Sequence, residues 1–155
     1  MKKLLDKSLG ITLVVLMAAI VITVLWQIFS RFILNSPSSY TEEIARYLLI
    51  WIGVLGAAYA SGQKEHLSIN ILQEKLSPKS RKKLLIGINI LIIIFCLLAL
   101  VLGGGNLVYT NYILGQNSAA LHLPLAYVYM VLPLSGILVV IYKINEIIYH
   151  KTYLL

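Results

Sequence analysis

The feature that most constrains this chain is a set of four long apolar stretches. They run over about residues 9–34, 44–62, 84–109 and 123–145. An α-helix needs about 20 apolar residues to cross the roughly 30 Å hydrocarbon layer of a bilayer. Backbone groups inside that layer have no water to bond, so a stretch of this length satisfies them as a helix. The sequence therefore predicts an all-α integral membrane protein, with four transmembrane helices in a single domain over residues 1–155.

The first stretch has to be distinguished from a secretory signal peptide, because lysines precede it. The apolar core of a signal peptide is about 7–15 residues long and ends at a small-residue cleavage site. Here Ala18 and Ala19 are followed by Ile20 and Val21, and the apolar run continues well beyond them. We therefore expect this segment to be retained as the first span.

The composition agrees with a protein surrounded by lipid. Hydrophobic residues make up 59% of the chain and charged residues only 12%, whereas an average soluble domain has about 25% charged residues. The net charge of +7 could suggest nucleic acid as a partner. The basic residues lie in the short segments between apolar stretches, however, which argues for the bilayer as the partner and against nucleic acid.

The distribution of basic residues predicts the orientation. Lysine or arginine occurs before the first span, between the second and third spans, and in the tail after the fourth, which we take to hold Lys143 and Lys151. Residues 35–43 and 110–122, which connect the other spans, contain neither. Because basic loops stay in the cytoplasm, we expect both termini to be cytoplasmic.

The connection between the second and third spans has an amphipathic pattern. Leu67, Ile71, Leu72 and Leu76 approximate one helical face. This pattern predicts a short interfacial helix along the inner membrane surface. Pro78 then suits the first turn of the third span.

Glycine and proline predict irregularity in the last two spans. Three consecutive glycines, residues 103–105, favour close helix packing or a local break. Pro124 suits the first turn of the fourth span, and Pro133 should kink it because proline removes a backbone hydrogen bond.

The chain lacks the side chains that membrane chemistry requires. It has one cysteine, Cys96, and three histidines that fall at span ends or in connections rather than at mid-membrane. No carboxylate lies in the middle of a span, as a proton-coupled multidrug antiporter would need. We therefore expect no enzymatic activity, catalytic residue, metal site or cofactor, which is typical of an accessory subunit.

A charged cluster opens the second span, in SPSSYTEEIARYLLIW, residues 36–51. Ser39 and Glu42 have the spacing of a capping box. Glu42 and Glu43 lie four and three residues before Arg46, so both can pair with it on one helix face. Arg31, at the end of the first span, could meet the same acids. The cluster could be a structural cap, a subunit contact or a site for a transported ion.

Residues 26–72 resemble the signature of the small membrane subunit, the DctQ type, of tripartite ATP-independent periplasmic (TRAP) transporters. The signature has an arginine ending the first span, a Glu-Glu-x-x-Arg cluster opening the second, an aromatic-rich run and a later histidine. The matching positions are Arg31, Glu42, Glu43, Arg46, Trp51, Gly56 and His66. Residues 118–136 resemble the second block of the family, although Leu125 and Ala126 stand where members often carry tryptophan.

The resemblance implies a role in the inner membrane of a bacterium. A large polytopic membrane subunit would hold the sodium and substrate sites, and a periplasmic binding protein would deliver a carboxylate-bearing substrate. The small subunit would scaffold the large one and help to dock the binding protein. Sialic acid or C4-dicarboxylates are the implied substrates, with the sialic-acid group the closer match. A self-sufficient exporter acting as a homodimer is the alternative. The candidate subunit-contact or structural residues are Arg31, Glu42, Glu43, Arg46, Trp51 and His66.

Overall fold

The described part of the chain is helical. A computed structural model describes residues 2–36, 38–63 and 78–152. The helices are α1 (Lys2–Phe32), α2 (Ser39–Gly62), α4 (Pro78–Phe95), the π-helix η1 (Cys96–Gly103), α5 (Gly104–Ile113), α6 (Leu125–Tyr129) and α7 (Val131–Thr152). The predicted interfacial helix lies outside the described residues. Pro78 begins α4, as its position in the sequence predicted.

Within the described residues, four helical segments are long and apolar enough to cross a membrane, which confirms the predicted number. They are Leu4–Phe32, Ser39–Gly62, Lys83–Ile113 and Leu125–Ile148. The second begins about five residues before the apolar stretch, and the third extends beyond it. The reason is that hydropathy marks the part of a helix suited to hydrocarbon, whereas the hydrogen-bonded helix continues into polar residues at either end.

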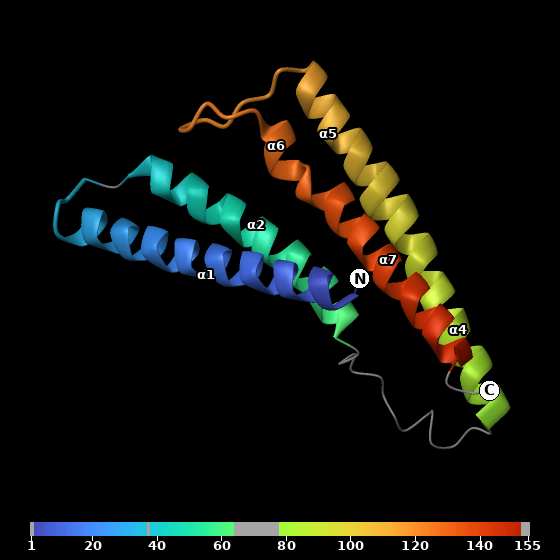
Figure 1. Cartoon of the computed structure of the whole chain (residues 1–155). Coiled ribbons are helices and arrows are strands. Elements are labelled where there is room, and N and C mark those ends of the chain that lie inside the picture. The colour runs from blue at the N-terminus through green and yellow to red at the C-terminus, as the bar shows by residue number, and fades with distance from the viewer. Residues whose placement is uncertain (1, 37, 64–77, 153–155) are drawn as a thin grey trace.

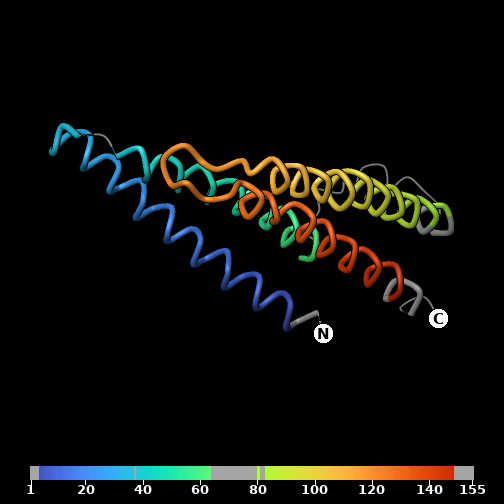
Figure 2. The backbone as a smooth tube through the Cα atoms, turned by 90° about the horizontal axis from the view of Figure 1, so that it is seen from above, coloured from blue at the N-terminus to red at the C-terminus, as the bar shows by residue number. Residues whose placement is uncertain are grey.

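The helices are arranged in a row rather than a closed bundle (Figure 1). Helix α1 lies antiparallel to α2, α2 packs on α7, and α7 packs on α4 and η1. The view from above gives the same order, with α1 at one side and the α4–η1–α5 helix at the other (Figure 2). A row gives its two middle helices, α2 and α7, neighbours on both sides, and leaves the outer helices open to their surroundings.

The buried core lies where α2 and α7 meet their neighbours. Leu9, Leu55, Val131 and Tyr142 form one cluster that joins α1, α2 and α7. Ala58, Cys96 and Val139 form a second cluster that joins α2, η1 and α7. The hydroxyl of Tyr142 also donates a hydrogen bond of 2.7 Å to Oδ1 of Asp6 and so connects α7 with α1.

One glycine of the predicted run permits close helix packing. A Cβ atom at Gly104 would lie 2.9 Å from Cβ of Leu132, whereas one at Gly105 would meet nothing within 4 Å. The glycines do not break the helix: the hydrogen-bonding pattern changes from that of the π-helix η1 to that of α5 at Gly103, while the helical segment Lys83–Ile113 continues through them. A π-helix is rare, and its hydrogen bonds span one residue more than those of an α-helix.

Pro133 interrupts the fourth span, as predicted. The proline has no N–H to donate to the carbonyl of Tyr129, four residues earlier. The helix is broken at this level: α6 ends at Tyr129 and α7 begins at Val131. Pro124, expected in the first turn, is instead the N-cap residue that precedes α6, in an extended conformation.

Candidate subunit-contact site

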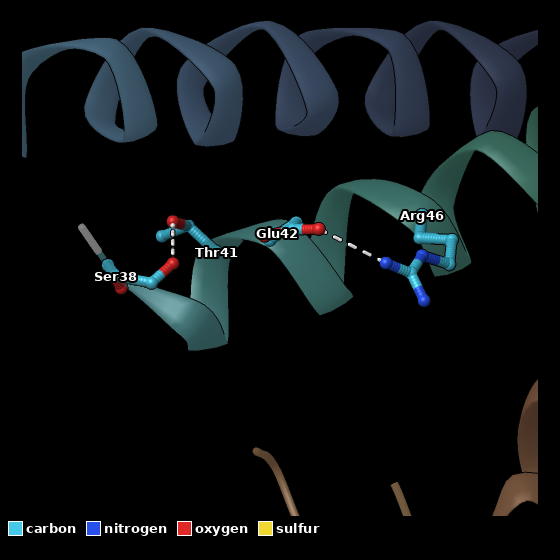
Figure 3. A network of polar contacts seen from close by, with 4 residues as sticks. All are labelled: Ser38, Thr41, Glu42 and Arg46. Carbon is cyan, nitrogen blue, oxygen red and sulfur yellow. Dashed lines mark hydrogen bonds and ion pairs between the residues drawn. The ribbon is translucent and has the colours of Figure 1, made fainter. Parts of the chain in front are cut away.

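The start of α2 is the centre of the candidate site. Its N-cap residue is Ser38, whose side chain makes no capping hydrogen bond. The hydroxyl of Thr41 donates a hydrogen bond of 2.9 Å to the carbonyl oxygen of Ser38 (Figure 3). The predicted capping box between Ser39 and Glu42 is therefore wrong. The helix begins at Ser39, one residue earlier than a capping box there requires, and Glu42 instead extends toward the following turn.

Glu42 forms the predicted ion pair with Arg46. Nη2 of Arg46 lies 3.1 Å from Oε1 of Glu42, and the two side chains are 64% and 62% exposed (Figure 3). An exposed pair at this spacing contributes about 0.3–0.5 kcal/mol to stability. This contribution is too small for stabilisation of the start of α2 to be the only role of the Glu42–Arg46 pair.

Glu43 does not pair with Arg46, contrary to prediction. Its Oε2 atom accepts a hydrogen bond of 3.0 Å from the backbone N–H of Leu121. No local spacing pattern predicts this contact, because the two partners are 78 residues apart.

The partner of Glu43 is the α5–α6 loop, residues 114–124. The loop closes on itself: Ser118 donates its N–H to the carbonyl of Leu123, at 2.9 Å, and its hydroxyl accepts from the N–H of Leu123, at 3.2 Å. Gly115 and His122 have positive φ angles of 59° and 55°, which the tight turns at both ends of the loop require. The loop is thus a defined structure rather than an open connection.

An open pocket of about 580 Å³ lies between α2 and the α5–α6 loop. It is lined by Ser39, Tyr40, Glu42, Glu43, Arg46, Ala119, Ala120 and His122. Sequence reasoning identified the three charged residues of α2 and missed the loop residues. The resemblance of residues 118–136 to a family block was the signal that could have indicated them.

The other predicted residues are more dispersed. Arg31 lies with its guanidinium carbon 5.9 Å from the ring centroid of its neighbour Phe32, and shares a smaller pocket with Glu42 without an ion pair to it among the described residues. The indole N–H of Trp51 donates a hydrogen bond of 3.0 Å to the carbonyl oxygen of Val128, and this bond joins α2 to α6. His66 lies outside the described residues.

Lys143 lies in a different environment from the one predicted. We predicted from the sequence that it lies in the basic tail after the fourth span. In the structure α7 continues beyond Lys143, and Lys143 is only 1% exposed. Its Nζ lies 2.9 Å from Oε2 of Glu146. A lysine buried next to a carboxylate is a structural ion pair rather than a topology signal.

Comparison with known proteins gives these features a context. The family described as tripartite ATP-independent periplasmic transporters, DctQ component, matches residues 20–151. A Haemophilus influenzae Rd protein named as a TRAP transporter small permease is 31% identical over 143 residues, which is 92% of this chain and 87% of the relative. The sialic acid TRAP transporter small permease protein SiaQ of Vibrio cholerae is 33% identical over 103 residues, which is 66% of this chain. The matched region spans 60% of the Vibrio protein.

A further relative is much longer than this chain. The sialic acid TRAP transporter permease protein SiaT of Haemophilus influenzae 86-028NP is 36% identical over 78 residues. These residues are 50% of this chain but only 12% of SiaT. The similar region is therefore a small part of a larger permease polypeptide.

Proposed function

Because the chain belongs to the DctQ family of tripartite ATP-independent periplasmic transporter components, we propose that it is the small, non-catalytic subunit of a sodium-coupled transporter. In this proposal it scaffolds a large permease subunit in the membrane and helps to dock a periplasmic binding protein. The substrate is a carboxylate-bearing molecule, sialic acid in the first instance and a C4-dicarboxylate otherwise. The name of the Vibrio relative supports sialic acid.

The long relative supports a large permease as the partner. In SiaT, the region similar to this chain occupies 12% of one polypeptide that is named as a permease. A segment that occurs in the same polypeptide as a larger permease in one protein is expected to associate with a separate one elsewhere. The similarity thus favours the scaffold role over that of an independent exporter.

The observation that carries the scaffold role is the exposed face of α2. Between residues 42 and 62, the exposed residues recur every three or four positions and so share one face. They are Glu42, Arg46, Leu49, Gly53, Ala57 and Ala60. Charged residues in a span rarely face lipid, and small residues allow a second helix to approach closely. We therefore assign the α2 face, defined by these six residues, to a transmembrane helix of the large permease.

The outer helices of the row expose a different kind of surface. Helix α1 exposes large apolar side chains, with Ile22 at 68% and Leu25 at 61%. Leu91 and Leu98 give the α4–η1 segment the same character, at 71% and 61% exposed. Such surfaces suit lipid chains, so the α2 face is the surface best suited to a protein partner.

The docking role depends on orientation. We propose that the chain lies in the bacterial inner membrane with both termini in the cytoplasm, because the N-terminal segment and the 63–83 connection are rich in lysine and arginine, whereas residues 35–43 and 110–122 contain neither. The ends of α1 and α5 and the pocket of about 580 Å³ then face the periplasm. That side is the one from which a soluble binding protein would arrive.

Co-purification tests the scaffold role directly. The chain, carrying an affinity tag, is co-expressed with a large TRAP permease subunit from the same organism and extracted in mild detergent. We expect the two subunits to elute together in a constant ratio. A chain that elutes alone while the permease is present in the same membranes would contradict the proposal. Substrate flux through liposomes that contain this chain alone would instead establish a self-sufficient exporter.

A further inference from the structure

The last turn of α1 carries an arginine beside the smaller pocket. This pocket, of about 300 Å³, lies between the end of α1 and the start of α2 and is lined by Gln27, Arg31, Ser38, Ser39 and Glu42. Arg31 is exposed and, among the described residues, forms no ion pair. Its contact with the Phe32 ring uses none of the five N–H donors of a guanidinium in a hydrogen bond. The pocket therefore has a cation with donors to offer.

The rest of the lining suits a phosphate group. Its neutral side chains, one amide and two hydroxyls, can all donate hydrogen bonds, and the side chain of Ser38 makes no capping bond. Glu42 is paired with Arg46 at 3.1 Å, so the charges of these two residues on the α2 face cancel. Arg31 is left as the net positive charge beside the pocket, which matches the single negative charge of a phosphodiester.

An exposed apolar stripe runs along α1 from Arg31 toward the middle of the membrane. Its residues lie at intervals of three and four before Arg31 and so share one side of the helix: Ile28, Val24, Val21 and Met17, which are 51%, 38%, 53% and 50% exposed. Residues 17 and 28 are eleven positions apart, which is about 17 Å of helix. Half of the hydrocarbon layer is about 15 Å thick. The stripe is therefore about as long as one lipid leaflet is deep.

Aromatic side chains indicate where the membrane surface lies on α1. Trp26 stacks on Phe29, with ring centroids 5.8 Å apart, and the two side chains are 52% and 42% exposed. Tryptophan is enriched at the level of the lipid headgroups. A lipid whose phosphate reaches the pocket beside Arg31 therefore has its acyl chains at the depth of the stripe.

We propose that Arg31 binds the headgroup phosphate of one phospholipid, and that an acyl chain of this lipid lies along the 17–28 stripe of α1. Gln27, one turn before Arg31, is the second donor to the phosphate. The site goes beyond the proposed function and does not depend on it, because it requires only that α1 spans a bilayer. With both termini in the cytoplasm, the lipid belongs to the periplasmic leaflet.

Native mass spectrometry of the full chain in detergent tests the role of Arg31. The chain is titrated with palmitoyl-oleoyl phosphatidylglycerol, and the dissociation constant of the first bound lipid is measured. Arg31→Gln should raise this constant at least about fivefold, because it removes charge-assisted hydrogen bonds. Lys83→Gln is the matched control: it makes the same charge change at an exposed position of the outer helix α4 and should leave the constant unchanged. Equal effects of the two variants would overturn the site.

Two competing molecules identify the ligand. Palmitoyl-oleoyl glycerol has the same chains without the phosphate and should bind at least about fivefold more weakly. Equal binding of this molecule would overturn the role of the headgroup. Inorganic phosphate lacks the chains and should not displace the lipid, even in excess. Displacement would show a simple anion site and overturn the assignment to a phospholipid.

A second variant covers the case in which Arg31→Gln fails to fold. Gln27→Leu removes one neutral donor from the pocket and should raise the dissociation constant about two- to tenfold, as expected for one lost hydrogen bond. Thermal unfolding in detergent shows which variants remain folded. A folded Gln27→Leu chain with unchanged lipid affinity would overturn the proposed phosphate contacts.

Photo-cross-linking locates the acyl chain. A phosphatidylglycerol with a photoreactive acyl chain is added in equal amount to the chain, and the labelled peptides are mapped. Residues 17–28 should be labelled more than the segment around Leu91 and Leu98, which is at least as exposed but has no such pocket beside it. This excess should disappear in Arg31→Gln. Equal labelling of the two segments in the wild-type chain would show a general lipid coat and overturn the inference.

Discussion

Two adjacent glutamates at the start of α2 make different contacts, which is the main result at the scale of single residues. Glu42 pairs along its own helix with Arg46, whereas Glu43 reaches a loop 78 residues away. They are one helical step apart, about 100° around the axis, so they project in different directions. The same type of side chain at two neighbouring positions therefore forms an ion pair within its own helix in one case and a tertiary contact in the other.

The two ion pairs of the described residues are expected to differ in their contribution to stability. Lys143 is 1% exposed, whereas Arg46 is largely exposed. Removing the partner of a buried charge is costly because the charge stays in a poorly solvated place. We expect Glu146→Gln to lower the free energy of unfolding by about 1.5–3 kcal/mol, the range for a hydrogen bond to a charged group, and Glu42→Gln by less than about 0.5 kcal/mol. Thermal unfolding in detergent measures both, and equal shifts would contradict this ranking.

The indole N–H of Trp51 is expected to stabilise the junction of α2 with α6. Trp51→Phe removes the hydrogen bond to the carbonyl of Val128 and keeps most of the ring. A lost hydrogen bond of this kind costs about 0.5–1.5 kcal/mol. Trp26→Phe is the matched control, since Trp26 is 52% exposed on α1 and stacks on Phe29. Unfolding midpoints of the two variants should differ, and a larger loss for Trp26→Phe would refute the contact.

At the scale of helices, adjacent glycines in α5 should respond to alanine in opposite directions. A Cβ at Gly104 would lie 2.9 Å from Cβ of Leu132, while a Cβ at Gly105 meets nothing within 4 Å. Alanine is favoured over glycine in a helix by about 0.5–1 kcal/mol. We expect Gly105→Ala to stabilise by up to this amount. Gly104→Ala should destabilise, by about 1–3 kcal/mol for an overpacked contact. Two shifts of the same sign in thermal unfolding would show that α5 and α7 are not packed this closely.

The sequence predicted the helices well and their contacts poorly, for a physical reason. Hydropathy is a property of a continuous segment, so four spans could be located and the break near Pro133 anticipated. The partner of Glu43 could not, because it depends on how α5 and α6 pack beside α2. Lys143 was misassigned for the same reason: its burial depends on the neighbours of α7, which no local pattern encodes. The Glu42–Arg46 pair was predictable because helical spacing alone brings the two residues together.

At the scale of the whole molecule, the row of helices leaves most of the apolar surface uncovered. In the α1 span only 6% of the most apolar window is buried within the chain, and in the fourth span 39%. Lipid can cover the large apolar side chains of the outer helices. It is poorly suited to the α2 face, which combines an ion pair with small side chains. Assembly with a larger membrane protein would complete that face, and a matched pair of glycines tests whether it does.

Gly53 lies on the α2 face and Gly87 on α4, and a Cβ at either would meet nothing within 4 Å. Leucine at both positions gains similar helix propensity, about 0.8–1 kcal/mol, and adds the same apolar side chain to an exposed surface. The isolated chain should therefore tolerate both variants equally, as measured by thermal unfolding in detergent. The complex with the large permease should tolerate the two variants unequally. A leucine at Gly53 would separate α2 from the permease helix, which small residues allow to approach closely. We expect Gly53→Leu to lower the co-purified yield of the large permease at least about fivefold, which corresponds to about 1 kcal/mol, and Gly87→Leu to leave it within about twofold. Equal yields would show that the α2 face is covered by lipid, and a selective loss with Gly87→Leu would move the contact to α4.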